Sequence, residues 1–163
     1  MKAAFFIGSE SDLEVIKGAL SILKEFGIPF SLEVTSAHRS PGRTKRLVME
    51  SEEQGAEIFI CAAGKAAHLA GVVASHTTYP VIGVPVGGSD LDGLDALLST
   101  VQMPKGVPVV CMGIGNHGAL NAAILAVQIL SLKDESLREK FKQYKIKLAE
   151  SIEASSKRVK EHL

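Results

Sequence analysis

The sequence predicts an α/β protein: a three-layer α/β/α sandwich of the Rossmann or flavodoxin type, with a central parallel sheet and a long C-terminal helix. Short, almost continuous apolar segments alternate with longer amphipathic ones along the chain, which is typical of strands joined through helices into a parallel sheet. Glycine-rich and polar segments follow the apolar ones, at the strand ends where such folds bind ligands.

Five apolar runs are the expected strands: Ala3–Ile7, Phe30–Val34, Ile58–Ala62, Val81–Val84 and Val107–Cys111. After the first of them, apolar residues recur at helical spacing from Leu13 to Leu23, and Gly27 is placed to end that helix. Pro41 is suited to begin a second helix, and Gly55 to end it.

Three more helical segments follow along the chain. Small, helix-compatible residues follow Ala66 as far as Ser75. The segment Ala119–Leu130 is almost wholly apolar, so it must be buried in the domain core or against another subunit. Residues 135–163 form one long charged pattern with a narrow apolar stripe. This terminal helix either packs on a neighbouring subunit or lies along its own domain.

The composition argues against several classes of partner. Lys plus Arg and Asp plus Glu are equal at 18 each, so no bulk charge favours nucleic acid or a membrane surface. No run approaches the roughly 20 apolar residues of a membrane helix. Cys61 and Cys111 lie in apolar runs and are interpreted as core thiols of a reducing compartment. We expect a cytoplasmic protein that binds neither nucleic acid nor membrane.

The loop after the first strand, Gly8–Asp12, contains Ser9, Ser11 and Asp12. A glycine followed by hydroxyls at a helix N-terminus offers free N–H groups to an anion. The alternative is a helix cap, in which Ser11 would be the N-cap and Glu14 its partner three residues later. The two interpretations are compatible, since Ser9 would remain free.

The loop after the second strand runs from Ser36 to Pro41 and contains His38 and Arg39. A histidine beside an arginine suits acid–base chemistry next to a bound phosphate or carboxylate. The alternative is a surface loop in which Ser40 caps the following helix.

The third loop continues from the strand through Gly64 and Lys65 to His68 and Leu69. Its small residues allow a ligand to approach the backbone closely. A Cys–His nucleophilic pair is disfavoured, because Cys61 lies within the strand pattern. The histidines show no spacing typical of metal ligands, so no metal site is expected.

A fourth loop, Gly113–Gly118, matches the G-x-G-x-x-G pattern of dinucleotide-binding folds. That pattern normally occupies the first strand–helix unit, whereas here it lies in the last. Only a polar terminal helix follows it, so no later strand could carry the acidic residue that binds ribose. We interpret it as a glycine-rich active-site loop.

Taken in order, these segments resemble the N5-carboxyaminoimidazole ribonucleotide mutase family. The resemblance runs from Gly8 to about Leu130 and rests on six ordered motifs: Gly8–Asp12, Ser36–Pro41, Ala66–Gly71, Pro80–Val86, Leu91–Asp95 and Val101–Val109.

The resemblance implies one catalytic domain over residues 1–163, with 135–163 as a terminal helix in subunit packing, and assembly into a homo-octamer. It implies conversion of a small ribonucleotide to its 4-carboxy isomer without metal, ATP or organic cofactor. His38 would be the acid–base residue. The other implied substrate-binding residues are Ser9, Ser11, Asp12, Ser36, Arg39, Gly64, Lys65, His68 and Leu69.

The chain departs from the family pattern at three places. Lys65 replaces a second glycine, Ala70 replaces a proline, and His117 adds an imidazole to the last glycine-rich loop. Lys65 resembles the basic residue of related carboxylases that fix free carbon dioxide, and a cation there could hold bicarbonate or a carboxylate. Three alternatives to a mutase therefore stay open: a carboxylase, a diverged paralogue acting on another carboxylated heterocycle, and a binding module that has lost the reaction.

Overall fold

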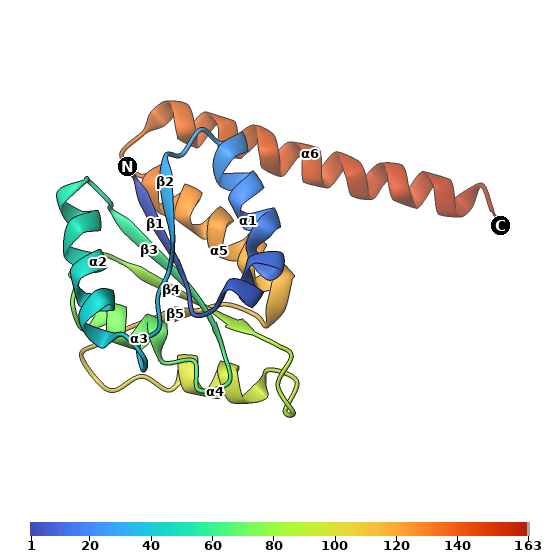
Figure 1. The fold of residues 1–163 in the computed structure, drawn as a ribbon. Helices are drawn as coiled ribbons and strands as arrows, with labels where there is room; N and C mark the ends of the chain where they lie inside the picture. The colour runs from blue at the N-terminus through green and yellow to red at the C-terminus, as the bar shows by residue number, and fades with distance from the viewer. Residues whose placement is uncertain (163) are drawn as a thin grey trace. The chain divides into compact units, whose positions relative to one another are not determined.

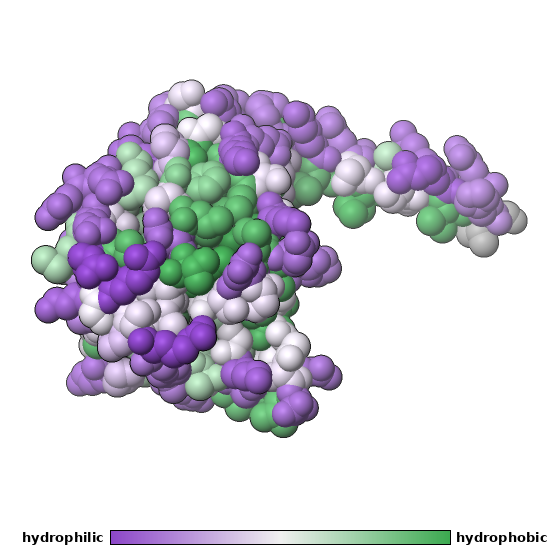
Figure 2. All heavy atoms as spheres, viewed as in Figure 1, coloured by the Kyte–Doolittle hydropathy of each residue, from purple (hydrophilic) through white to green (hydrophobic). Residues whose placement is uncertain are grey.

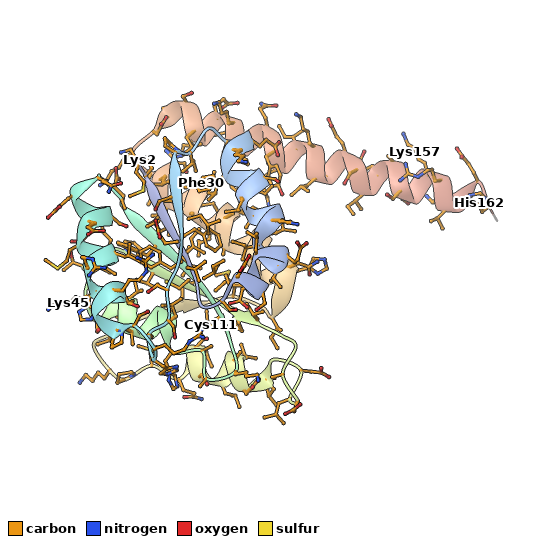
Figure 3. The ribbon with its side chains drawn as sticks, in the orientation of Figure 1. Lys2, Phe30, Lys45, Cys111, Lys157 and His162 are labelled. Atoms are coloured by element: carbon orange, nitrogen blue, oxygen red, sulfur yellow. The ribbon has the colours of Figure 1, made fainter. Side chains whose placement is uncertain are left out.

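A computed structural model describes residues 1–162 and contains a parallel sheet of 5 strands in the order β2-β1-β3-β4-β5. The strands are β1 (Ala3–Ile7), β2 (Phe30–Val34), β3 (Ile58–Gly64), β4 (Val81–Val86) and β5 (Val110–Cys111). This is the flavodoxin-like order. Figure 3 labels Phe30 on the edge strand β2 and Cys111 on β5.

Helices cover both faces of this sheet (Figure 1). The helices of the described residues are η1 (Glu10–Asp12), α1 (Leu13–Glu25), α2 (Pro41–Glu53), α3 (Leu69–Ala74), α4 (Leu94–Val101), α5 (Gly115–Leu130) and α6 (Glu135–Lys160), the last of which belongs to a separate compact unit. The predicted three-layer fold is confirmed. The chain divides into two compact units, residues 1–126 and 127–163, and the boundary falls inside α5.

The core of the first unit follows from the apolar strands. Alternate residues of β1 and β3, Phe6 and Phe59 among them, point to the face covered by α2 and α3. Their rings lie 5.8 Å apart between centroids. On the other face α1 packs beside α5, since Gly18 lies against Leu120. The side chains of β1, β3 and β4 are buried almost throughout, as the sequence predicts for a sheet covered on both sides.

Most predicted strand and helix starts are confirmed. Three are wrong: those of the last strand, of α3 and of α5. The last strand begins at Val110 and not at Val107, because Pro108 has no N–H to donate to a neighbouring strand. Helix α3 begins at Leu69 and not directly after Ala66, because residues 65–68 form tight turns through the bonds from Ala67 N to Lys65 O and from His68 N to Ala66 O.

Helix α4 was missed in the sequence, and α5 begins four residues earlier than predicted, at Gly115. The signal for α4 was present, since Leu94, Leu98 and Val101 recur at helical spacing. These side chains are about half exposed, while the small residue Ala96 lies against the sheet. Among residues 1–162, none of the helices is both long and apolar enough to cross a bilayer.

Gly27 and Gly55 end their helices as predicted. Their φ angles are +73° and +87°, in the left-handed region that glycine adopts without strain. Helix α1 stops at Glu25 and α2 at Glu53, so each glycine is the second residue after the last helical one.

Candidate active site

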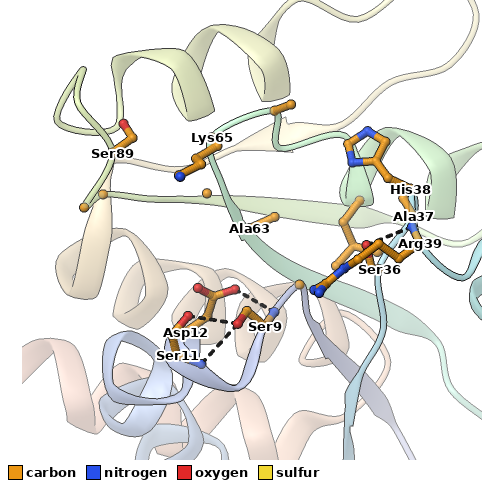
Figure 4. Close-up of a pocket in the computed structure, with 16 residues that line it drawn as sticks. Ser9, Ser11, Asp12, Ser36, Ala37, His38, Arg39, Ala63, Lys65 and Ser89 are labelled. Atoms are coloured by element: carbon orange, nitrogen blue, oxygen red, sulfur yellow. Dashed lines mark hydrogen bonds between the residues drawn. The ribbon is translucent and has the colours of Figure 1, made fainter.

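Four loops at the carboxyl ends of β1 to β4 surround a cavity of about 560 Å³ (Figure 4). Its position agrees with the general rule for ligand sites in open parallel sheets. The residues that line it are Gly8, Ser9, Ser11, Asp12, Ser36, Ala37, His38, Arg39, Ala63, Gly64, Lys65, Ala66, Leu69, Gly87, Gly88 and Ser89. Nine of the ten predicted site residues are in this set, and His68 is outside it.

The loop after β1 is stabilised by hydrogen bonds that its own side chains make within the loop. Ser9 is the N-cap: its N–H donates to Asp12 Oδ2 (3.0 Å), and its Oγ accepts from Ser11 N (3.4 Å) and Ser11 Oγ (2.9 Å). The capping box is therefore formed by Ser9 and Asp12, and the predicted Ser11–Glu14 box is wrong. Ser9 is not free of the cap, although its hydroxyl hydrogen remains available to donate toward the cavity.

Asp12 is a buried carboxyl at the floor of the cavity, with 7% of its surface exposed. Desolvation raises the pKa of this carboxyl, while hydrogen bonds from the Ser9 backbone, the Ser11 hydroxyl and the Gly8 backbone oppose the rise. The charged form of this carboxyl therefore lowers the stability of the fold. A ligand that donates hydrogen bonds to Asp12 would offset that cost.

We expect Asp12→Asn to be more stable than the wild type at neutral pH and equal to it in acid. Because the pKa is raised in the folded state, the wild type loses stability as pH rises from the unfolded value of about 3.9 through the folded value. The amide keeps an oxygen that can accept from Ser9 N. Urea unfolding followed by circular dichroism at several pH values tests this.

Glu10→Gln is the matched control, because Glu10 is an exposed carboxylate in the same turn. It should leave the pH dependence unchanged. A stability difference for Asp12→Asn that is constant from acid to neutral pH would contradict the role given to burial.

The loop after β2 carries His38 and Arg39 on a rigid frame. Ser36 Oγ accepts from Arg39 N (3.2 Å), and Ser40 donates to Ser36 O through its N–H (2.9 Å) and its hydroxyl (3.1 Å). Ser40 is the predicted N-cap of α2, but its side chain bonds within the loop and not to the helix. Figure 4 shows the Arg39 side chain running toward Ser9.

In the loop after β3, the cationic residue Lys65 has a strained backbone conformation. Lys65 has a φ of +55°, a left-handed conformation that costs a non-glycine residue roughly 1–2 kcal/mol. It lines the cavity together with Gly64 and the buried Leu69. Lys65 and Arg39 thus give the cavity two cationic side chains, and Asp12 gives it a carboxyl. This charge distribution suits an anionic ligand that also carries hydroxyl donors.

His68 contacts His38 instead of lining the cavity. The distance from His38 Nε2 to His68 Nδ1 is 2.9 Å, and the rings cross at 80° with centroids 5.0 Å apart. His68 is the N-cap of α3. The sequence predicted both imidazoles as site residues but not their contact.

The loop after β4 was not predicted from the sequence to be part of the site. Gly87, Gly88 and Ser89 line the cavity, and Ser89 Oγ donates to Asp95 Oδ1 (2.7 Å) at the start of α4. The signal was the same as in the other loops: two glycines and a serine directly after a buried strand.

The glycine-rich loop after β5 lies beside the main cavity. Ile114, Gly115 and Asn116 line a second cavity of about 350 Å³, which shares Gly87 with the first. His117 is exposed and lines neither cavity. Within residues 1–162, no three His, Cys, Asp or Glu side chains are grouped to hold a metal ion. Burial raises the pKa of the Cys61 thiol, so this thiol has no nucleophilic character.

The AIR carboxylase family model matches residues 2–151. The chain belongs to the AIR carboxylase family. It is 54% identical over 155 residues to the N5-carboxyaminoimidazole ribonucleotide mutase of Methanocaldococcus jannaschii, with 95% of each chain covered. The crystal structure of Treponema denticola PurE matches it with a TM-score of 0.86 and 29% identity, over 95% of this chain and 96% of that one.

The same family includes relatives with a different name. The phosphoribosylaminoimidazole carboxylase of Saccharomyces cerevisiae is 47% identical over 146 residues, which cover 90% of this chain but only 25% of that protein. The resemblance to the mutase family found in the sequence is confirmed.

Proposed function

We propose that this chain is an isomerase of de novo purine synthesis that converts N5-carboxyaminoimidazole ribonucleotide to 4-carboxy-5-aminoimidazole ribonucleotide. The observation that carries the proposal is the cavity in which His38, Arg39, Ser9 and Asp12 meet. The 54% identity to a relative named as this mutase supports it. Residues 1–163 would act as one catalytic domain, with no metal or organic cofactor in the reaction.

The reaction needs one group that can both give and take a proton. When the bond between the exocyclic nitrogen and the carboxylate breaks, carbon dioxide is released and the nitrogen gains a proton. When C4 bonds the trapped carbon dioxide, C4 loses its proton as aromaticity returns. His38 can donate the first proton and accept the second, so that it ends in its starting state.

The remaining lining residues suit the ribose phosphate part of the substrate. Arg39 can bind the phosphate in a bidentate manner, and Ser9 and Ser36 can donate hydroxyl hydrogens to it. Ser11, whose hydroxyl donates to Ser9 Oγ, would lie beside them. Asp12 can accept from a ribose hydroxyl. Gly64, Lys65 and Leu69 would line the part of the cleft that holds the heterocycle and carbon dioxide.

A carboxylase acting on free carbon dioxide is the second candidate, and Lys65 is the observation that favours it. Lys65 lines the cavity, and its backbone adopts a left-handed conformation. Backbone strain of this kind is common at functional sites. A purified-enzyme assay of the 4-carboxy product separates the two activities. One reaction starts from N5-carboxyaminoimidazole ribonucleotide without carbon dioxide, and the other from aminoimidazole ribonucleotide with bicarbonate.

A mutase should form product quickly in the first reaction and slowly in the second. Efficient product formation only from bicarbonate would identify a carboxylase. No product in either reaction would contradict both activities and favour a diverged paralogue or a binding module.

We expect Lys65→Gly to keep kcat for the mutase reaction within about threefold of the wild type, because a contact made equally with the bound substrate and with the transition state does not change kcat. The free energy of unfolding should rise by about 0.5–1 kcal/mol, since glycine adopts positive φ without strain. A loss of kcat greater than about tenfold would instead assign Lys65 to carbon dioxide or bicarbonate binding during the reaction.

Asp92→Gly is the matched control for strain. Asp92 has a φ of +50° and does not line the cavity. It should show a similar gain in stability and no change in activity.

The homo-octamer and the cytoplasmic location are also proposed. The first compact unit exposes Leu94, Leu98 and Val101 on one side of α4, each about 50% exposed. Figure 2 shows hydrophobic surface gathered between β2 and α1. Val34 in β2 and Met49 in α2 are also exposed. Such patches are typical of subunit interfaces. Sedimentation equilibrium would measure the oligomer.

A further inference from the structure

We propose that His68 is a positioning residue that fixes the tautomer of His38, so that the two imidazoles act as one acid–base unit. The proposal rests on the function proposed above. Its starting observation is the 2.9 Å separation between His38 Nε2 and His68 Nδ1. At that distance one nitrogen must carry the hydrogen and the other must present its lone pair.

The backbone holds both rings in place. His38 sits in the loop framed by Ser36 and Ser40, directly before α2. His68 N donates to Ala66 O (2.8 Å), and its carbonyl accepts from Val72 N (3.0 Å) in α3. Ala67 and Leu69, the neighbours of His68, are buried. His68 is therefore fixed behind His38 while lying outside the residues that line the cavity.

The geometry assigns different roles to the two nitrogens of His38. Nε2 is engaged by His68, which leaves Nδ1 for the substrate. We infer that His38 Nε2–H donates to His68 Nδ1, so that Nδ1 of His38 presents a lone pair to the proton of C4. When Nδ1 takes that proton, the bond to His68 becomes charge-assisted and stronger. His68 stabilises the charged form of His38 without touching the substrate.

This arrangement resembles the general use of a hydrogen-bonded partner to orient a catalytic imidazole. It predicts that His68 acts on kcat and not on substrate binding. His68→Ala should lower kcat by about 30-fold, which is part of the 10²–10⁴-fold that a positioned acid–base residue contributes. KM should change by less than about threefold, because the cavity wall is unaltered.

Two matched variants complete the kinetic test. His68→Asn keeps a hydrogen-bonding atom close to the position of Nδ1, and kcat should recover to within about fivefold of the wild type. His76→Ala removes an exposed imidazole just beyond α3 and should have no effect. A normal kcat in His68→Ala, a loss confined to KM, or an Asn variant no better than Ala would each overturn the proposal.

A spectroscopic measurement tests the hydrogen bond without any substrate. In protein labelled with ¹⁵N-histidine, at a pH where imidazoles are neutral, a scalar coupling should connect His38 Nε2 to His68 Nδ1. The coupling should persist in His76→Ala and vanish in His68→Ala; its absence from the wild type would refute the pairing. If the wild type failed to convert the carboxyamino substrate, the proposed reaction would fall, while this measurement would still decide whether the pair exists.

Discussion

His38→Asn should fold normally, bind the ribonucleotide and lose between about 10²- and 10⁴-fold in kcat, the usual contribution of a positioned acid–base group. Asparagine fits the space of the imidazole but cannot exchange a proton near neutral pH. The ring lines the cavity and its Nδ1 is not engaged by His68. Removing it therefore affects the proton transfers to the exocyclic nitrogen and from C4.

The measurement combines steady-state kinetics with calorimetric titration of the substrate. His117→Asn is the matched control, because His117 is exposed and lines neither cavity; its turnover should equal that of the wild type. Circular dichroism should show the same helix content for both variants. Turnover of His38→Asn within about tenfold of the wild type would refute the acid–base role, whatever the substrate affinity.

Gly118→Ala should destabilise the protein by about 3 kcal/mol, at the upper end of overpacking effects. A Cβ at Gly118 would lie 1.6 Å from Gly113 O and 2.6 Å from Gly113 C. These are backbone atoms, so no side-chain rotation relieves the clash. The loop from Gly113 to Gly115 would have to move, or the first turn of α5 would have to unwind.

Gly113→Ala is the control from the same motif. A Cβ at Gly113 meets nothing within 4 Å, so this variant should stay within about 0.5 kcal/mol of the wild type. Urea unfolding followed by circular dichroism suits both variants, because the chain has no Trp. Protein concentration is held constant, since an oligomer's apparent stability depends on it. Equal unfolding midpoints for the two variants would contradict the close contact between Gly118 and Gly113.

The Gly118 contact also explains the apparent dinucleotide motif. In a dinucleotide fold these glycines allow a close approach to the pyrophosphate. Here Gly118 allows the helix to pack against its own preceding loop, and Gly115 adopts a φ of +78°. The sequence pattern is that of a dinucleotide-binding loop, but here the close contact of Gly118 is with Gly113 of the same chain and not with a ligand.

Much of the site could be predicted because it follows from local pattern. The apolar run Ala3–Ile7 identifies a buried strand, and the polar residues after it must lie at its carboxyl end. The same reasoning brought His38, Arg39 and Lys65 to one edge of the sheet, where all three line the cavity. The loop Gly87–Ser89 carried an equal signal and could have been included.

Other features depend on contacts that no local pattern encodes. The capping residues of the first loop differ by two positions from the prediction, because Ser9 and not Ser11 adopts the extended N-cap conformation. Helix α4 turns Leu94 and Leu98 outward, which reverses the usual direction of an apolar stripe. The left-handed φ of Lys65 is likewise a property of its turn and not of its residue type.

The sequence by itself determined the fold class, the ends of the first two helices and the loops that carry chemistry, because apolar periodicity and glycine positions act over a few residues. The tertiary structure alone decided the pairing of His38 with His68. Their loops follow β2 and β3, which are not neighbours but flank β1 in the sheet. Only the strand order brings these imidazoles, 30 residues apart, to hydrogen-bonding distance.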